Sequence, residues 1–213
     1  MTSYFETRFR YSEIKNRVWK ELSEYLQKNI PIKEEHKVLD VGAGYCYFIN
    51  NIKCKEKHAI DISKIPLLKA NRDVITKIGD VRNLKKYYKE NYFDIAFCSN
   101  ILEHLEMRDV IKVLKQINFI LKPNGKLIIL SPNYKYSYRE YFDDYDHKSI
   151  LTDKNIKDIL SLCKFKVEKI YPKFLPFSAN ELKFFNKFLF RAYIYSPIKP
   201  FAKQMLVVAT KLN

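Results

Sequence analysis

The chain has 213 residues, of which 47% are hydrophobic and 15% aromatic, and this composition excludes a disordered polymer. The length suits one domain with a sizeable core. A formal net charge of +15 favours anionic partners such as nucleic acid, phosphorylated metabolites or an acidic membrane surface. The lysines are scattered along the whole chain, however, so an ordinary solvated surface explains the charge equally well.

Cysteine usage and the N-terminus indicate the compartment. The four cysteines form no CxxC pair, so we expect neither a zinc site nor a disulfide framework, as in a reducing compartment. Residues 1–8 lack an apolar signal segment, and no run of about 18 uncharged apolar residues occurs. The sequence therefore predicts a cytoplasmic protein, with peripheral contact at the inner membrane face left open.

Hydrophobic periodicity predicts alternating helices and strands. The first helix covers residues 12–30, within an N-terminal helical segment 1–34, and ends at Pro31. The predicted strands cover residues 37–41, 57–60, 74–78, 93–98, 126–132, 166–170 and 204–210. Further helices are predicted over residues 108–121, 153–163 and 182–193, with a turn at 122–125. This rhythm indicates an α/β protein with a mostly parallel sheet.

A glycine-containing loop follows the first predicted strand. The apolar run that contains Asp40 leads directly into Gly42 and Gly44, and glycines let the backbone bend sharply and approach a ligand. We expect a helix over residues 47–52 with its N-terminus toward that ligand, and we expect the glycines to serve ligand entry and not the fold. Asp61 ends the next apolar run, 19 residues after Gly42, where a ribose-binding acid belongs. The third glycine of the dinucleotide motif is absent, so a plain tight turn is the alternative.

In their order along the chain, the motifs resemble those of class I S-adenosylmethionine-dependent methyltransferases over residues 35–213. Residues 40–44 are similar to the first motif of that family, which holds the methionine part of the cofactor, although Cys46 replaces the usual small residue. Asp61 matches the acid that bonds both ribose hydroxyls. Residues 79–81 resemble the third-strand element, whose acid, here Asp80, accepts from the adenine amino group. Residues 93–105 and 121–127 are similar to the fourth-strand segment and to the turn before the fifth strand.

The resemblance implies a fold and a cofactor site. The fold is a single domain over residues 1–213 with a Rossmann-like, seven-stranded, mostly parallel sheet, helices on both faces and an antiparallel C-terminal strand. The implied S-adenosylmethionine site, without a metal, comprises Asp40, Gly42, Ala43, Gly44, Asp61, Ile62, Asp80, Val81, Ser99 and Asn100. A nicotinamide enzyme is the main competitor, but it would need a substrate domain that this length hardly accommodates.

Candidate acceptor-side residues follow the fourth and fifth strands, within expected insertions at 132–165 and 172–203. His147, in an acidic and aromatic loop, is the preferred base for a hydroxyl acceptor, and His104 with neighbouring Glu103 is the second candidate. Packing beside the cofactor is the alternative for His104, and capping of the next helix is the alternative for His147. Asn133 could bond acceptor or cofactor, although asparagine is ordinary in a turn.

Residues 182–193 place Leu182, Phe185, Phe188, Leu189, Ala192 and Tyr193 on one helical face and Lys183, Lys187 and Arg191 on the other, and Phe184 and Phe190 widen the apolar arc. Such a helix could lie on anionic lipid or pack on its own sheet.

Three functions therefore stay open. The first is methyl transfer to an oxygen of a small-molecule, glycan or lipid-linked acceptor, and the net charge suits an anionic acceptor. The second is RNA methylation, supported by the charge but without a visible RNA-binding module or a base-methylation motif after the fourth strand. The third is cofactor binding without catalysis, against which Asp61 and the acceptor-side loop argue.

Overall fold

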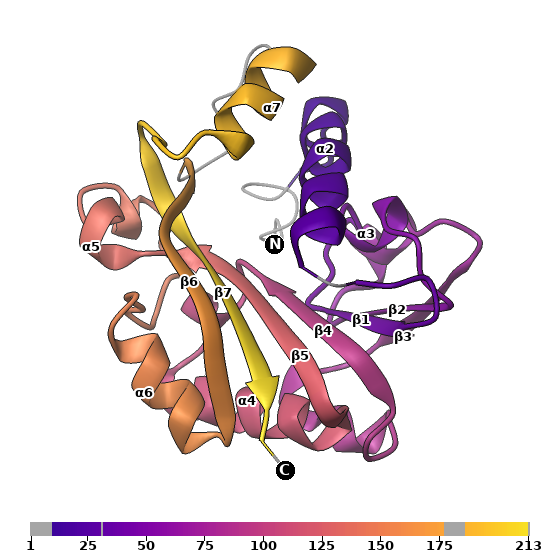
Figure 1. Ribbon diagram of the computed structural model, residues 1–213. Coiled ribbons are helices and arrows are strands. Elements are labelled where there is room, and N and C mark those ends of the chain that lie inside the picture. The colour runs from indigo at the N-terminus through magenta and orange to yellow at the C-terminus, as the bar shows by residue number, and fades with distance from the viewer. Residues whose placement is uncertain (1–9, 31, 177–185, 213) are drawn as a thin grey trace.

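The computed structural model describes residues 10–30, 32–176 and 186–212, and these form a seven-stranded sheet in the order β3-β2-β1-β4-β5-β7-β6 (Figure 1). The strands are β1 (Lys37–Val41), β2 (Glu56–Asp61), β3 (Val74–Ile78), β4 (Phe93–Ser99), β5 (Leu121–Pro132), β6 (Phe165–Pro176) and β7 (Ala202–Lys211). Neighbours among β1 to β5 pair in parallel, and β7 runs antiparallel between β5 and β6. The predicted sheet is confirmed, including its antiparallel C-terminal strand.

Helices cover both faces of the sheet. The α-helices are α2 (Glu13–Asn29), α3 (Lys64–Leu67), α4 (Met107–Ile120), α5 (Tyr134–Ser137), α6 (Asn155–Leu162) and α7 (Lys187–Tyr195). Short 3-10 turns are η1 (Ile49–Asn51), η2 (Val81–Lys86), η3 (Leu102–His104) and η4 (Tyr141–Asp143). Ser12 caps α2 by accepting a hydrogen bond from the Lys15 N–H. Pro31, the predicted end of this helix, lies outside the described residues.

Alternation along the strands divides the apolar side chains between two cores, because successive side chains of a strand point to opposite faces. In β5, Leu127 and Ile129 pack with α4 and α6, whereas Ile128 and Leu130 pack on the face that α2 and α7 cover. The other central strands alternate in the same way. Both faces being buried explains why these strands read as nearly continuous apolar runs.

The helix predicted over residues 47–52 is wrong, since only the single turn η1 forms there. Side chains take the place of helical backbone bonds: the Asn51 side-chain amide donates to the Tyr47 carbonyl, and that of Asn50 donates to the Lys69 carbonyl. Asparagine competes with helix in this manner. The first loop therefore presents no long helix, and no helix dipole, to a ligand.

The turn predicted at residues 122–125 falls inside β5. There the pairing with β4 shifts register between Phe93 and Ile95, and Asn124 takes a left-handed φ of 63°. The residues predicted to form a turn therefore form an irregularity within β5 and do not interrupt the strand. The last two strands are also longer than predicted, because their antiparallel pairing continues to Pro176 and Ala202.

The face of helix α7 that packs against the protein differs from the predicted face. Lys187 and Arg191, expected on a polar outer face, form ion pairs with Glu21 of α2, whose side chain is buried. Phe188 and Leu189 are exposed. Packing against α2 and the sheet instead uses Ile194, with Phe190 and Tyr193 half-buried. Residues 182–185 of the predicted stripe lie outside the described residues.

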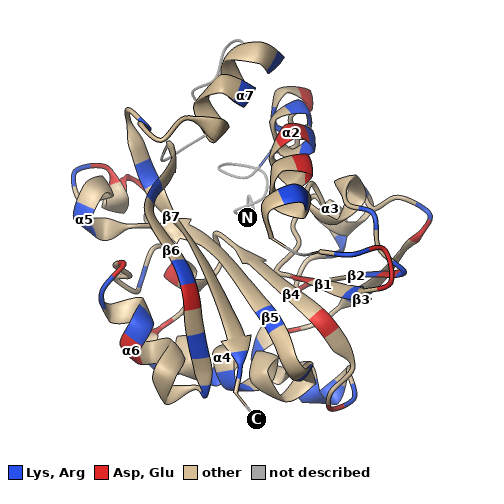
Figure 2. Ribbon diagram, in the orientation of Figure 1, with Lys and Arg blue, Asp and Glu red and all other residues tan. Residues whose placement is uncertain are grey.

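Charge and hydropathy add two observations. Lysine and arginine are spread over α2, α6, α7, β6 and the connecting segments and do not gather on one element (Figure 2). In the part of the chain that the structure describes, no helix has both the length and the apolar character needed to cross a membrane.

Candidate cofactor and acceptor site

The glycine loop begins where β1 ends and is held by the neighbouring strand β2. The N–H groups of Gly42 and Ala43 both donate to the Ile60 carbonyl, and the Gly44 N–H donates to Asp61 Oδ2 at 2.9 Å. Gly42 and Gly44 have φ values of +70° and +50°, which L side chains rarely adopt. The loop backbone and Asp61 therefore form one hydrogen-bonded unit at the carboxyl edge of the sheet.

Gly42 also packs closely. A Cβ on Gly42 would lie 2.2 Å from Ile101 Cδ1, so a larger residue would force the side chain of Ile101 to move. This glycine is therefore required by the fold as well as by any ligand, which corrects the prediction that the loop glycines serve ligand entry alone. Cys46 is buried and takes a left-handed φ of 58°, at the position where a small residue was expected.

Asp61 closes β2 with both carboxylate oxygens directed at the loop region. Oδ1 accepts from the Ser63 N–H and Oδ2 from the Gly44 N–H, each at 2.9 Å. A carboxylate has about four acceptor positions, so about two stay open for a ribose diol. Burial raises the pKa of Asp61, and the two backbone donors counteract that rise. The adjacent Ile62 side chain is 67% exposed, which suits an apolar surface for an adenine ring.

Asp80 is more occupied than the sequence indicated. The Arg82 side chain binds both of its oxygens, at 2.6–3.0 Å, and the Arg82 N–H donates to Oδ1. These contacts lower the pKa of Asp80 and keep it ionised. Val81 is buried in the core, so only its backbone can face a ligand. The adenine contact of Asp80 stays a prediction and must share the carboxylate with Arg82.

Asp40 lies beneath the loop, 3% exposed. Burial raises its pKa to about 8, the Ile49 N–H lowers it, and the nearby Asp61 raises it. A buried acid of this kind favours a cationic neighbour. Ser99 and Asn100 end β4 at the same edge, and Asn100 takes a left-handed φ of 49°.

An aromatic group beside the loop was not predicted. The Tyr11 ring stacks on Tyr47 with centroids 5.5 Å apart and meets Tyr45 edge-on at 5.6 Å. The Ser12 N–H donates to the Tyr47 hydroxyl at 2.8 Å. The start of α2 is thereby fixed on the glycine loop. The available sequence signal was the pair Tyr45 and Tyr47, which directly follows the loop glycines.

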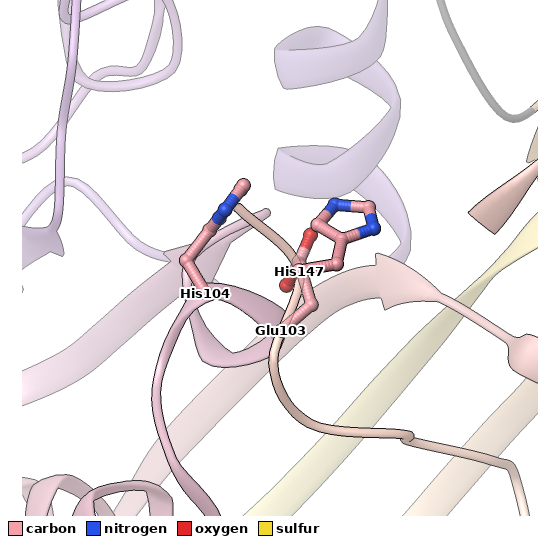
Figure 3. Close-up of side chains that lie close together, drawn as sticks. All are labelled: Glu103, His104 and His147. Carbon is pink, nitrogen blue, oxygen red and sulfur yellow. The ribbon is translucent and has the colours of Figure 1, made fainter. Parts of the chain in front are cut away.

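The acceptor side combines two histidines and a buried acid. Glu103 and His104 lie on η3, directly after β4, and His147 lies in the loop after η4 (Figure 3). The two imidazole rings have centroids 4.8 Å apart. Hydrogen bonds fix the loop there: the Lys148 and Ser149 N–H groups donate to the Glu103 carbonyl. The structure thus joins both predicted histidines at one place.

The polar surroundings of this cluster are specific. Burial raises the pKa of Glu103 to about 8, although Ser131 donates to its Oε2 at 3.1 Å. His104 Nδ1 lies 3.4 Å from Asp146 Oδ2, and burial together with His147 lowers the pKa of His104. This lowered pKa favours the neutral form of the His104 imidazole.

Asn133, by contrast, is fully buried. Its side-chain amide donates to Asp153 and to the Pro172 carbonyl, and its oxygen accepts from the Lys135 N–H. These bonds use both donors and cap α5. Asn133 therefore holds the loop together, and its predicted contact with acceptor or cofactor has no donor left to make it.

A seven-stranded sheet with a glycine loop after β1 and an acid at the end of β2 defines a Rossmann-like nucleotide-cofactor protein. The chain belongs to the methyltransferase domain family, whose model matches residues 8–168. This match confirms the predicted family.

Individual relatives agree with that assignment. The chain is 27% identical to a phosphoethanolamine N-methyltransferase from Plasmodium falciparum over 161 residues, 68% of this chain and 59% of that protein. It is 36% identical to an uncharacterised protein from Methanocaldococcus jannaschii over 117 residues, 54% of this chain and 49% of that protein. The chain thus spans about half to three-fifths of the length of these curated relatives.

Solved structures share the fold. A SAM-dependent methyltransferase from Archaeoglobus fulgidus superposes with a TM-score of 0.68 at 21% identity, covering 97% of this chain and 98% of that one. The fold and the family confirm S-adenosylmethionine as the cofactor of this class. The residues fit it: Asp61 would hold the ribose, Ile62 would lie against the adenine, and the glycine loop with buried Asp40 would hold the cationic methionine part. When bound, the cofactor supplies a methyl group already activated by its sulfonium.

Proposed function

We propose that the protein transfers the methyl group of S-adenosylmethionine to a small-molecule, glycan or lipid-linked acceptor, at oxygen. The observation that carries the proposal is the placement of Glu103, His104 and His147 at the carboxyl edge of the sheet, beside the strand ends that would hold the cofactor. Methyl transfer needs the acceptor and the methyl group in line, which is a positioning task.

A hydroxyl acceptor also has to lose a proton. A neutral imidazole at this position can take that proton, as predicted for His147, or it can bind a cation that makes the hydroxyl more acidic. Loop residues 141–149 carry three aspartates, so this acceptor side is not uniformly basic despite the net charge of +15.

The alternative accepting atom is the nitrogen of an amine. The relative from P. falciparum is named for N-methylation of phosphoethanolamine, and a phosphorylated amine would suit a basic protein. RNA is a less favoured acceptor, because lysine and arginine do not gather on one helix or strand (Figure 2).

Membrane or lipid contact is a further part of the proposal. After residue 186, four large apolar side chains are at least two-thirds exposed: Phe188, Leu189, Ile198 and Phe201. Such side chains can enter the interface of a membrane that holds a lipid-linked acceptor. Sedimentation with anionic vesicles, comparing the wild type with Phe188→Ser and Phe201→Ser, tests this contact.

The acceptor itself is best found with a labelled cofactor. The protein is incubated with S-adenosylmethionine carrying a radiolabelled methyl group and with fractionated cell extract, and then separately with phosphoethanolamine. Label in small-molecule, glycan or lipid fractions supports the proposal, and fragmentation of the labelled product in a mass spectrometer identifies the methylated atom. Label in RNA alone would support the alternative function, and no label in any fraction would favour binding without catalysis.

A further inference from the structure

The cluster of Glu103, His104 and His147 has the spacing of a set of metal ligands. One donor atom from each residue lies within 4.8 Å of the other two. Ligands about 2.1 Å from a common ion are separated by roughly 3–4 Å, so the most distant pair of donor atoms needs to close by no more than about 2 Å. Figure 3 shows the Glu103 carboxylate between the two imidazole rings.

Glu103 supplies the second, independent observation. Its side chain is only 1% exposed, and its Oε1 has no hydrogen-bond partner among the described residues. The other oxygen accepts from a single hydroxyl, that of Ser131. Buried carboxylates are normally paired, hydrogen-bonded or bound to a metal. A cation at this place would give Oε1 a partner and would stabilise the ionised form of the carboxyl group.

The two histidines are oriented as metal-binding histidines are. His147 Nδ1 lies 2.6 Å from the Tyr141 carbonyl, to which it can only donate, so in the neutral ring the lone pair is on Nε2. His104 Nδ1 faces a carboxylate of Asp146 at 3.4 Å. A carbonyl or carboxylate behind the second ring nitrogen is the usual arrangement around a bound metal.

We propose that Glu103, His104 and His147 bind one divalent transition-metal ion next to the cofactor site. Two imidazole nitrogens and one carboxylate oxygen suit zinc, cobalt or manganese, and three protein ligands leave open positions on the ion. An imidazole bound to metal has no lone pair for a proton, so this role replaces the base role of the histidines.

The consequence for catalysis rests on the proposed function. An acceptor hydroxyl that occupies an open position on the ion becomes more acidic and releases its proton to solvent. Its oxygen then forms the new O–CH₃ bond while the C–S bond of the cofactor breaks, and that electron pair stays on sulfur. The products are the methylated acceptor and S-adenosylhomocysteine.

Metal binding can be tested without any acceptor. The full chain is stripped with EDTA, dialysed against Co²⁺ or Zn²⁺, and assayed for bound metal and for the visible absorption of Co²⁺. We expect one ion per chain and a rise in melting temperature on metal addition. Glu103→Gln, which keeps the size of the side chain, and His147→Ala should each weaken binding by at least tenfold. His36→Ala, which removes a histidine far along the sheet, is the matched control and should bind as the wild type does.

Circular dichroism establishes that each variant is folded before its affinity is compared. Equal metal affinity of wild type, Glu103→Gln and His147→Ala would overturn the inference, as would absence of binding in the wild type. Methyl transfer is measured separately with and without EDTA on the labelled fractions. Metal binding without transfer to any acceptor would contradict the proposed function alone, and transfer that EDTA leaves unchanged would contradict the metal's catalytic role.

Discussion

Replacement of Asp61 by alanine tests the cofactor site most directly. The carboxylate accepts from the Gly44 and Ser63 N–H groups and has further lone pairs for the ribose hydroxyls. Losing the hydrogen bonds of a charged acceptor to a diol should weaken cofactor binding by about 2–3 kcal/mol. That energy corresponds to roughly 30- to 140-fold in the dissociation constant.

The same substitution should also lower the stability of the protein. The buried Gly44 N–H would lose its acceptor, and an unsatisfied buried donor costs about 1–3 kcal/mol of stability. Urea unfolding without cofactor measures the loss of stability. Calorimetric titration with S-adenosylmethionine measures the loss of cofactor affinity. Asp61→Asn keeps one acceptor oxygen and should fall between alanine and the wild type in both measurements.

Asp73→Ala is the matched control. This aspartate precedes β3 at the opposite edge of the sheet, where it pairs with Lys57 and is exposed, so its removal should leave cofactor affinity unchanged. An Asp61→Ala protein that is folded and binds cofactor as tightly as the wild type would refute the assignment. Reduced stability with unchanged affinity would reduce Asp61 to a support of the loop.

Three further outcomes are expected. Gly42→Ala should lower the free energy of unfolding by about 1–2 kcal/mol because of its positive φ and the approach to Ile101, and an unchanged urea midpoint would contradict this. Affinity for the cationic cofactor should rise with pH up to about 8, where Asp40 ionises, and then level off; Asp40→Asn should abolish that part of the dependence, and an identical pH profile would contradict it. His147→Ala should lower turnover by about 10²-fold or more with cofactor affinity intact, because His147 acts on the acceptor side either as a base or as a metal ligand, and normal turnover on the true acceptor would contradict both roles.

The sign of the pH effect on cofactor affinity depends on whether Asp40 is protonated or ionised in the free protein and in the cofactor-bound protein. The free protein holds Asp40 protonated below about pH 8 because burial disfavours the carboxylate. A nearby cation favours the ionised form, so cofactor binding must release a proton below that pH, and raising the pH removes this cost. For folding alone the effect is opposite: a raised carboxyl pKa stabilises the folded state at low pH, and that contribution is lost as pH rises from about 4 to about 8.

The cofactor side could be predicted from the sequence because its signals are local. Asp40, Gly42 and Asp61 each sit at the end of an apolar run, and the carboxyl ends of parallel strands share one edge of the sheet. The helix predicted over residues 47–52 did not form, because the Asn51 side chain bonds the nearby Tyr47 carbonyl and the Asn50 side chain bonds the distant Lys69 carbonyl. Such competition depends on where Lys69 lies in space, which no periodicity encodes.

The acceptor side depended on contacts that are distant in sequence. His147 was predicted from its loop and His104 from its place after β4, but their meeting follows from hydrogen bonds of residues 148 and 149 to the Glu103 carbonyl, about 45 residues away. Nothing in the sequence indicates which residues of two such distant segments will form hydrogen bonds with each other.

The environment of Glu103 opposes the chemistry of a carboxyl group. A glutamate 1% exposed, held by one hydroxyl and placed between two histidines, opposes the preference of carboxylates for water. Folds retain such conflicts mainly where function requires them. If stability alone governed the position, Glu103→Leu would be neutral or stabilising, because a buried apolar side chain would remove the desolvation cost. A urea midpoint that rises in Glu103→Leu while metal binding or methyl transfer is lost would show that the chain keeps this glutamate for its chemistry. A midpoint that falls with both functions retained would assign Glu103 to the fold.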